Sequence, residues 1–106
     1  MSLGFDQGVW AAHGDGHLTR FDPRPGHLGV NSDIHVAPAL DALATGEGRR
    51  AVWVISGQTR SLYRIVNADP AHLSGSVIFA SAPVAVTLQG RYVWVATADG
   101  KLTQLT

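Results

Sequence analysis

The stretch His13-Gly14-Asp15-Gly16-His17 comes closest in this sequence to a pattern that could perform chemistry. Two histidines flank a Gly-Asp-Gly turn, and the two rings can lie on the same side of a hairpin. Histidine is the commonest metal ligand, and the carboxylate of Asp15 could add an oxygen ligand. We therefore predict His13, Asp15 and His17 as a candidate ligand or metal site. The alternative is that all three are ordinary polar neighbours of a tight Asp-Gly turn.

The other histidines and aspartates favour structural roles. His27 and His72 each stand before a leucine at matching places in the chain, and His35 is isolated. Asp22-Pro23 and Asp69-Pro70 are turn-forming pairs, in which the carboxylate can accept hydrogen bonds from nearby backbone N–H groups. The sequence has no phosphate-binding loop, no nucleophile elbow and no aromatic platform beside basic residues.

The composition of the 106 residues is that of one small domain. Eight basic side chains balance eight acidic ones, which argues against the clustered basic face that binds nucleic acid. The chain has no cysteine, so it can form no disulfide, zinc–thiolate site or thiol nucleophile. It contains neither a signal-peptide pattern nor an apolar stretch of the ~18 to 20 residues that a membrane span needs. These observations leave the compartment open.

A repeated phrase organises the chain. Trp10, Trp53 and Trp94 each follow a valine, and they lie 43 and 41 residues apart. This period matches the ~40 to 45 residues of a four-stranded propeller blade. After each Val-Trp strand comes a turn and then a Leu-x-[Arg/Gln]-apolar strand, at Leu18 to Phe21, Leu62 to Ile65 and Leu102 to Leu105. Arg20 and Arg64 occupy the same place in this phrase, and we expect them to line a blade edge or to pair with a carboxylate.

The repeat predicts an all-β fold of four-stranded antiparallel meander blades. We name the strands A to D from the propeller axis outward. We expect a partial blade over residues 1–35, a full blade over 41–79 and an incomplete blade over 84–106, all in one segment of residues 1–106. Residues 1–5 would be the end of an A strand, and the D strands would cover residues 29–35 and 75–79. The chain then holds about two and a half to two and three-quarter blades.

One segment gives conflicting signals. Residues 38–44 have proline at a possible first helical position and apolar residues at helical spacing, which favours a short helix. The aligned residues 83–88 have the pattern of a strand. Because tertiary context often overrides local propensity, we expect an A strand over residues 41–45.

These phrases resemble the repeats of bacterial propeller proteins of the YVTN, NHL and streptogramin-lyase-like (virginiamycin B lyase-like) group. The group's pattern is roughly apolar-Ala-apolar-Gly-x-Gly-x-Val-Trp-Val, a turn, then Leu-x-Arg-apolar-Asp-Pro. Residues 43–54 and 93–102 carry it most clearly, and the resemblance covers nearly the whole chain. It implies a propeller in which the repeat positions are structural: Trp10, Trp53, Trp94, Asp22, Pro23, Asp69 and Pro70.

The resemblance does not carry an enzyme activity with it. Lyases of this group use histidine and glutamate near the central axis with a divalent metal. No position here matches that set, and the only glutamate, Glu47, lies in a Gly-Glu-Gly turn. The sequence therefore predicts no catalytic residue and names no cofactor.

The length shapes the functional expectation, because propellers close with roughly four to eight blades. We expect a C-terminal fragment of a larger propeller that serves as a non-catalytic binding or scaffold module. Its partners would be the missing blades or further copies of itself. The ligand would be a protein or a small molecule at the loop face or in the central tunnel. Alternatives are part of a lyase-like enzyme whose catalytic residues lie elsewhere, an oligomeric ring of copies that binds a ligand, or another small β fold.

Overall fold

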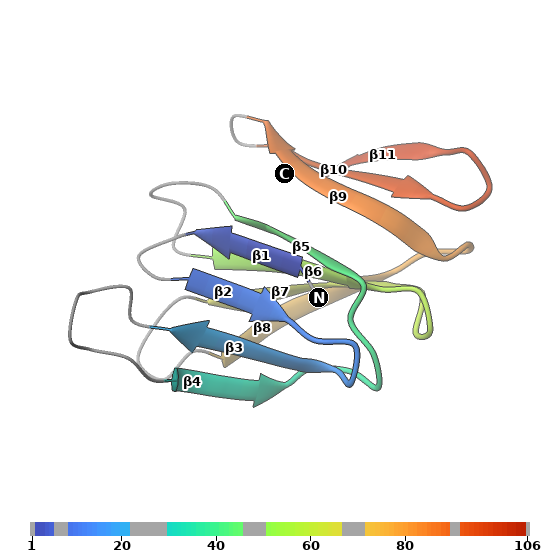
Figure 1. The fold of residues 1–106 in the computed structure, drawn as a ribbon. Helices are drawn as coiled ribbons and strands as arrows, with labels where there is room; N and C mark the ends of the chain where they lie inside the picture. Colours follow the sequence, from blue (N-terminus) through green and yellow to red (C-terminus); the bar gives the residue numbers. More distant parts are fainter. Residues whose placement is uncertain are drawn as a thin grey trace.

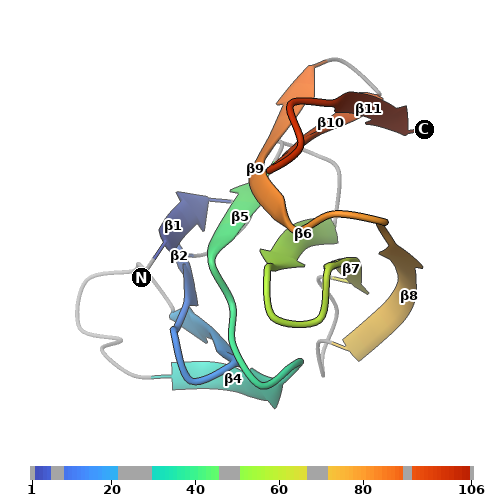
Figure 2. The same cartoon turned by 90° about the vertical axis from the view of Figure 1, so that its right-hand side faces the viewer.

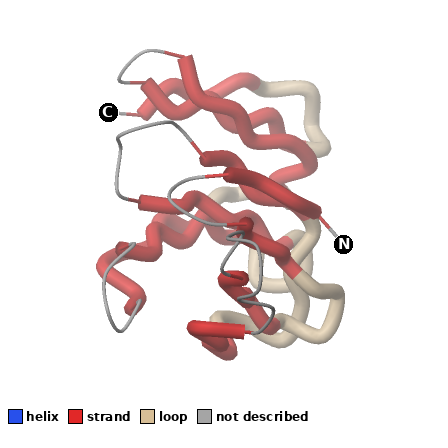
Figure 3. Tube along the Cα trace, turned by 60° about the vertical axis from the view of Figure 1, so that its left-hand side comes forward, coloured by secondary structure: helices blue, strands red, loops and turns tan. Residues whose placement is uncertain are grey.

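A computed structural model describes residues 2–5, 9–21, 30–45, 51–66, 72–89 and 92–105. Within these ranges the regular structure consists of strands, and no helix could cross a membrane (Figure 3). The strands are β1 Ser2–Phe5, β2 Val9–Ala12, β3 His17–Phe21, β4 Val30–His35, β5 Ala42–Thr45, β6 Ala51–Ser56, β7 Ser61–Val66, β8 His72–Ile78, β9 Pro83–Gln89, β10 Tyr92–Thr97 and β11 Leu102–Leu105.

The strands form three antiparallel sheets that follow one another along the chain (Figure 1). The first sheet has the order β1-β2-β3-β4, the second β5-β6-β7-β8, and the third β9-β10-β11. Each strand pairs with its neighbour in the chain, so every sheet is a meander. The predicted fold class is thereby confirmed. The uncertain A strand of the first sheet exists as β1, which pairs with β2 over all four of its residues.

The first strands of the three sheets lie next to one another. β5 contacts β1 on one side and β9 on the other, and Figure 2 shows all three around the middle of the molecule. The sheets fan outward from these inner edges to β4 and β8. This is the arrangement of successive propeller blades around an axis.

Two apolar clusters hold the sheets together. Trp10 lies in the cluster between the first and second sheets, together with Val52 and Val54 of β6. Trp53 lies in the cluster between the second and third sheets, together with Val93 and Val95 of β10. Alternate residues of a strand point to opposite faces, so β6 supplies one face to each cluster, and all six of its residues are buried. Trp10 and Trp53 therefore lie at the contacts between successive sheets.

The repeated arginine lies over the repeated tryptophan, and its expected pairing with a carboxylate stays a prediction. Arg20 and Arg64 lie directly across the ladder from Trp10 and Trp53. Their guanidinium carbons lie 5.5 Å and 5.9 Å from the centroids of these indole rings. A cation over an indole face contributes about 0.5–1 kcal/mol at an exposed site. The arginine therefore lies over the ring of the tryptophan across the ladder in both sheets.

The segment with conflicting signals is a strand. Residues 42–45 pair with residues 52–55 of β6 and form β5, and this tertiary pairing overrides the local helical pattern. β8 differs from the prediction, because it begins at His72 instead of Gly75. A bulge between Arg64 and Ile65 accommodates one extra residue of β8. The pairing of β7 with β8 therefore continues as far as Val66 and His72. A bulge stands at the equivalent place in the first sheet, between Arg20 and Phe21.

Leucines at one repeat position test this packing. Leu18 is fully buried, whereas its equivalent Leu102 is 66% exposed. We expect Leu18→Ala to lower the free energy of unfolding by about 2–5 kcal/mol, because it leaves a cavity between two sheets. The matched control Leu102→Ala should cost less than about 1 kcal/mol. Urea denaturation followed by circular dichroism measures both. Equal losses would show that the sheets do not pack as described.

Candidate functional site

The predicted triplet lies at the turn that joins β2 to β3. The backbone N–H of His13 donates to the carbonyl of His17 at 2.8 Å, so the two residues face each other across the hairpin. Gly16 has a φ of +94°, and a Cβ there would lie 1.6 Å from the carbonyl oxygen of Ala37. Glycine is therefore required at this position. The N–H of Val36 donates to the Gly16 carbonyl at 2.9 Å and fixes the turn against the neighbouring chain.

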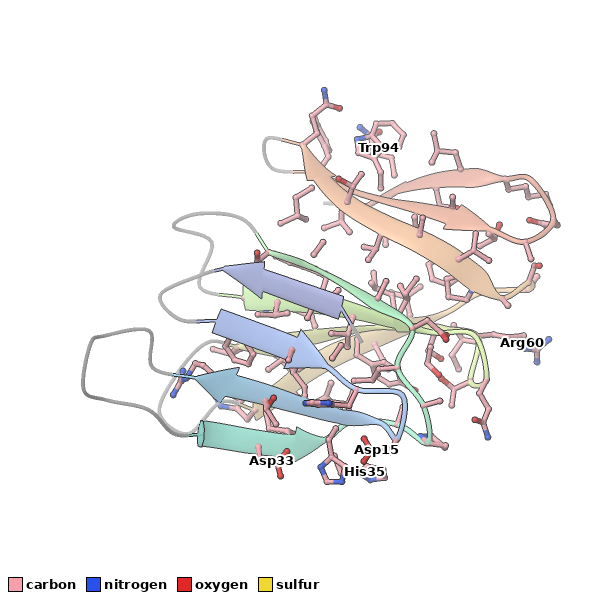
Figure 4. The ribbon with its side chains drawn as sticks, in the orientation of Figure 1. Asp15, Asp33, His35, Arg60 and Trp94 are labelled. Carbon is pink, nitrogen blue, oxygen red and sulfur yellow. The ribbon has the colours of Figure 1, made fainter. Side chains whose placement is uncertain are left out.

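The three predicted side chains line one cavity of about 300 Å³, together with Thr19 and Asp33. The register explains the grouping, because Thr19 pairs with Asp33 and His17 with His35. Figure 4 shows Asp15, Asp33 and His35 gathered at this end of the first sheet. Sequence reasoning missed Asp33. Asp33 lies on the predicted D strand, where alternate side chains share one face of the sheet. Only the strand register shows that it lies beside His17.

Local hydrogen bonds engage every member of this group. His13 Nε2 lies 2.9 Å from Thr19 Oγ1, and His17 Nδ1 lies 3.1 Å from Asp33 Oδ1. The backbone N–H of His17 donates to Asp15 Oδ1 at 3.2 Å, so Asp15 caps its own turn. The rings of His17 and His35 lie 4.9 Å apart and are tilted by 45°. The side chains of His17 and Asp33 are 40% and 51% exposed, so water screens their attraction.

The side chains of this group are suited to bind a polar ligand at the surface of the chain. Among the described residues, no three histidine or acidic side chains are grouped so that they could hold a metal ion. The imidazoles and carboxylates offer hydrogen-bond donors and acceptors to a small polar ligand. Binding of a ligand by His13, Asp15 and His17 stays a prediction.

The remaining predicted residues fall into two sets. The repeat tryptophans Trp10, Trp53 and Trp94 lie on the second strand of each sheet. The turn residues lie outside the described residues: Asp22, Pro23, Asp69 and Pro70. The same holds for His27 and Glu47, whereas His72 begins β8.

A second, larger cavity of about 470 Å³ lies between the second and third sheets. Its lining combines apolar side chains with three polar ones, those of Arg64, Ser76 and Gln104. Its lining consists of Trp53, Leu62, Arg64, Gly75, Ser76, Val77, Val93, Gln104 and Leu105. We refer to this cavity as the β8–β11 groove. Sequence reasoning missed it, although the expected lack of a D strand after β11 was a signal for an opening here.

The turn between β10 and β11 holds the described carboxylate whose pKa is clearly perturbed. A hydrogen bond from the Thr97 hydroxyl lowers the pKa of Asp99 below its usual value. Partial desolvation acts in the opposite direction and is outweighed. The Lys101 N–H, which donates to Asp99 Oδ1 at 3.3 Å, and the Lys101 ammonium also favour the charged form. Asp99 therefore acts as a turn cap.

A metal titration tests the triplet. A ligand raises the thermal unfolding midpoint only if it binds the folded state preferentially. Because the described residues offer no group of three metal-ligating side chains, we expect excess zinc chloride to leave the midpoint of the wild-type chain unchanged. A His13→Ala/His17→Ala variant is the matched control. If zinc raised the midpoint of the wild-type chain but not that of this variant, the triplet would be a metal site.

Acidification tests the cap. The pKa of Asp99 is lower in the folded chain than in the unfolded chain, so its contribution is present above the unfolded pKa. This contribution is lost as the pH falls below about 4 and through the folded pKa. We expect the stability of the wild-type chain to fall more steeply over this range than that of Asp99→Asn or Thr97→Val. Denaturation series at several pH values measure it, and identical pH profiles would exclude the cap.

Comparisons with known proteins bear on the fold. No protein-family model matches the chain, and no curated protein matches it. Among solved structures, it is similar to the crystal structure of BamB from Moraxella catarrhalis, with a TM-score of 0.75 and 17% sequence identity. The match covers 92% of this chain and 29% of that chain. BamB is a β-propeller, and the described sheets of this chain are therefore propeller blades in fold.

Proposed function

We propose that this chain is a non-catalytic binding or scaffold segment of a larger β-propeller, in which its first and third sheets dock against further blades. The chain spans 29% of the length of the BamB chain that it matches. The proposal is supported by the internal repeat, because equivalent positions can be compared in three sheets of one chain.

The repeat leucines carry the proposal. Leu18 and Leu62 are 0% and 4% exposed, and each lies in a cluster between its own sheet and the next one. Leu102 holds the same position in the third sheet and is 66% exposed. Large apolar side chains at one position of a repeat have one packing role, so an uncovered Leu102 marks a face that a further sheet would cover.

Trp94 lies on the same face of the third sheet. It points away from the other two sheets, as Figure 4 shows. Its Nε1 is buried and has no hydrogen-bond partner. An unsatisfied buried donor costs about 1–3 kcal/mol. This donor is enclosed by the chain itself, whereas the rest of the half-buried indole stays open to a docked blade.

The chemistry of the missing partner follows from the two contacts that are present. In each, a tryptophan face meets alternating valines of the next sheet, Val52 and Val54 or Val93 and Val95. The partner for the Trp94 face is therefore a strand with β-branched residues at every second position, as in a further blade. The sequence phrases support a propeller of the YVTN, NHL or streptogramin-lyase-like group as the larger protein.

Light scattering coupled to size exclusion tests this proposal. We expect the wild-type chain to associate as its concentration rises, because the Trp94 face is uncovered. Leu102→Glu should shift the population towards the monomer. Leu73→Glu is the matched control, because Leu73 is also exposed, at 48%, but lies on β8 of the second sheet. Circular dichroism checks that both variants fold.

Two results would contradict the proposal. A folded wild-type monomer at every concentration would show that the face needs no partner. A closed ring of discrete mass would show that copies of the chain supply the blades, which is the ring-forming alternative.

A further inference from the structure

We propose that the β8–β11 groove binds a flat, apolar small molecule that carries a carboxylate, in chemical terms an aromatic acid. The inference goes beyond the proposed function, because both sheets that form the groove belong to this chain. Six of the nine described residues that line it lie on β6, β7 and β8 of the second sheet, which has all four strands. The groove has a volume of about 470 Å³, and small-molecule sites have volumes of about 300–1,000 Å³.

The groove lies where the packing of β8 departs from the repeat. At the first contact between sheets, Ile34 of β4 packs against the apolar cluster that contains Trp10. Val77 is the equivalent of Ile34, because each pairs with the repeat leucine of its own sheet, but Val77 is 40% exposed and lines the groove. Gly75 also lines it, and a Cβ added to Gly75 would meet no atom within 4 Å. A shorter side chain and a glycine on β8 therefore leave space beside the third sheet.

The inner part of the groove is an apolar surface. Trp53, Leu62 and Val93 line it, and these residues are only 7%, 4% and 2% exposed. Leu105 of β11 also lines the groove and packs against the same apolar cluster. A flat apolar ring that lies on the indole and the aliphatic side chains leaves water, which is the favourable step in apolar binding. The inner part of the groove therefore suits an aromatic ring.

Arg64 gives the groove a positive charge at its exposed side. The described lining contains no aspartate or glutamate to neutralise this charge. The guanidinium carbon lies 5.9 Å from the Trp53 ring centroid, and Nη1 donates to the Ser74 hydroxyl at 2.9 Å, so two contacts orient the group. A guanidinium has five N–H groups, and its planar fork matches a carboxylate. Arg64 can therefore bind the carboxylate of a ligand whose ring lies in the apolar part of the groove.

Two neutral polar groups complete the lining. The Ser76 hydroxyl and the Gln104 amide can each donate a hydrogen bond to a ligand oxygen or accept one from a ligand N–H or O–H group. Gln104 approaches from the third sheet, whereas Arg64 and Ser76 belong to the second. A ligand that contacts both sides therefore bridges the two sheets.

The cavity at the turn between β2 and β3 has the opposite charge. Asp15 and Asp33 line it, and no lysine or arginine is among its described lining residues. Like charges brought together disfavour binding, so an anion should avoid that cavity. A small aromatic acid should therefore distinguish the groove from the cavity at the β2–β3 turn.

The probe is 2-naphthoate, titrated into the full 106-residue chain at a concentration where the chain is monomeric. We expect saturable NMR shifts of the amide signals of Gly75, Val77 and Gln104, which line the groove. The neutral isostere 2-naphthamide should bind at least about tenfold more weakly, because hydrogen bonds between two charged groups are about twice as strong as neutral ones.

Three variants locate the site. Arg64→Gln should weaken binding of 2-naphthoate at least about tenfold and leave binding of 2-naphthamide nearly unchanged. Gly75→Leu should abolish binding of both probes, because its side chain fills the open space beside Gly75. Gln58→Leu is the matched control, since Gln58 is an exposed residue of the β6–β7 turn and does not line the groove. Circular dichroism checks that each variant folds.

The comparison of the two probes leaves the protein unchanged, so the test holds even if Arg64→Gln does not fold. Absence of saturable binding, equal affinity for the two probes, or shifts confined to the β2–β3 turn would overturn the inference. Unchanged binding by folded Gly75→Leu would overturn it as well. The result is independent of the association measurement, because the docking face carries Leu102 and Trp94, neither of which lines the groove.

Discussion

The fold depends on one contact, in which a tryptophan on the second strand of a sheet packs against alternating valines on the second strand of the next. A sheet of this size has two apolar faces and cannot bury either alone. β6 shows the result, because all of its residues are buried between a sheet on each side. The arginine across the ladder lies over the indole ring, at Trp10 and again at Trp53.

The contact between two sheets is directional, and the three sheets therefore differ in the faces that they expose. Trp10 and Trp53 each face the next sheet along the chain, and Trp94 of the third sheet points away from the other two sheets (Figure 4). The polar group around His13 and His17 lies on the first sheet, whereas the groove lies between the second and third. The third sheet combines the exposed Leu102 with the groove that separates it from the second sheet.

The sequence was sufficient to predict the architecture because the tryptophan period and the following leucine recur in all three sheets. It also indicated the strand at residues 42–45, since the aligned segment of the next repeat resolved a local helical pattern. The pairing of Asp33 with His17, the arginine above the tryptophan and the early start of β8 could not be predicted. The first two depend on strand register and the third on a bulge, and patterns of hydrophobicity specify neither.

Proton–proton distances measured by nuclear Overhauser spectroscopy test the central contact most directly. We expect cross-peaks from the Trp10 indole to the methyl groups of Val52 and Val54, and from the Trp53 indole to those of Val93 and Val95. In the monomer, Trp94 should show no cross-peak to Val52 or Val54, because it points away from the second sheet. Cross-peaks from Trp10 to the valines of β10, or none between the sheets at all, would contradict the account.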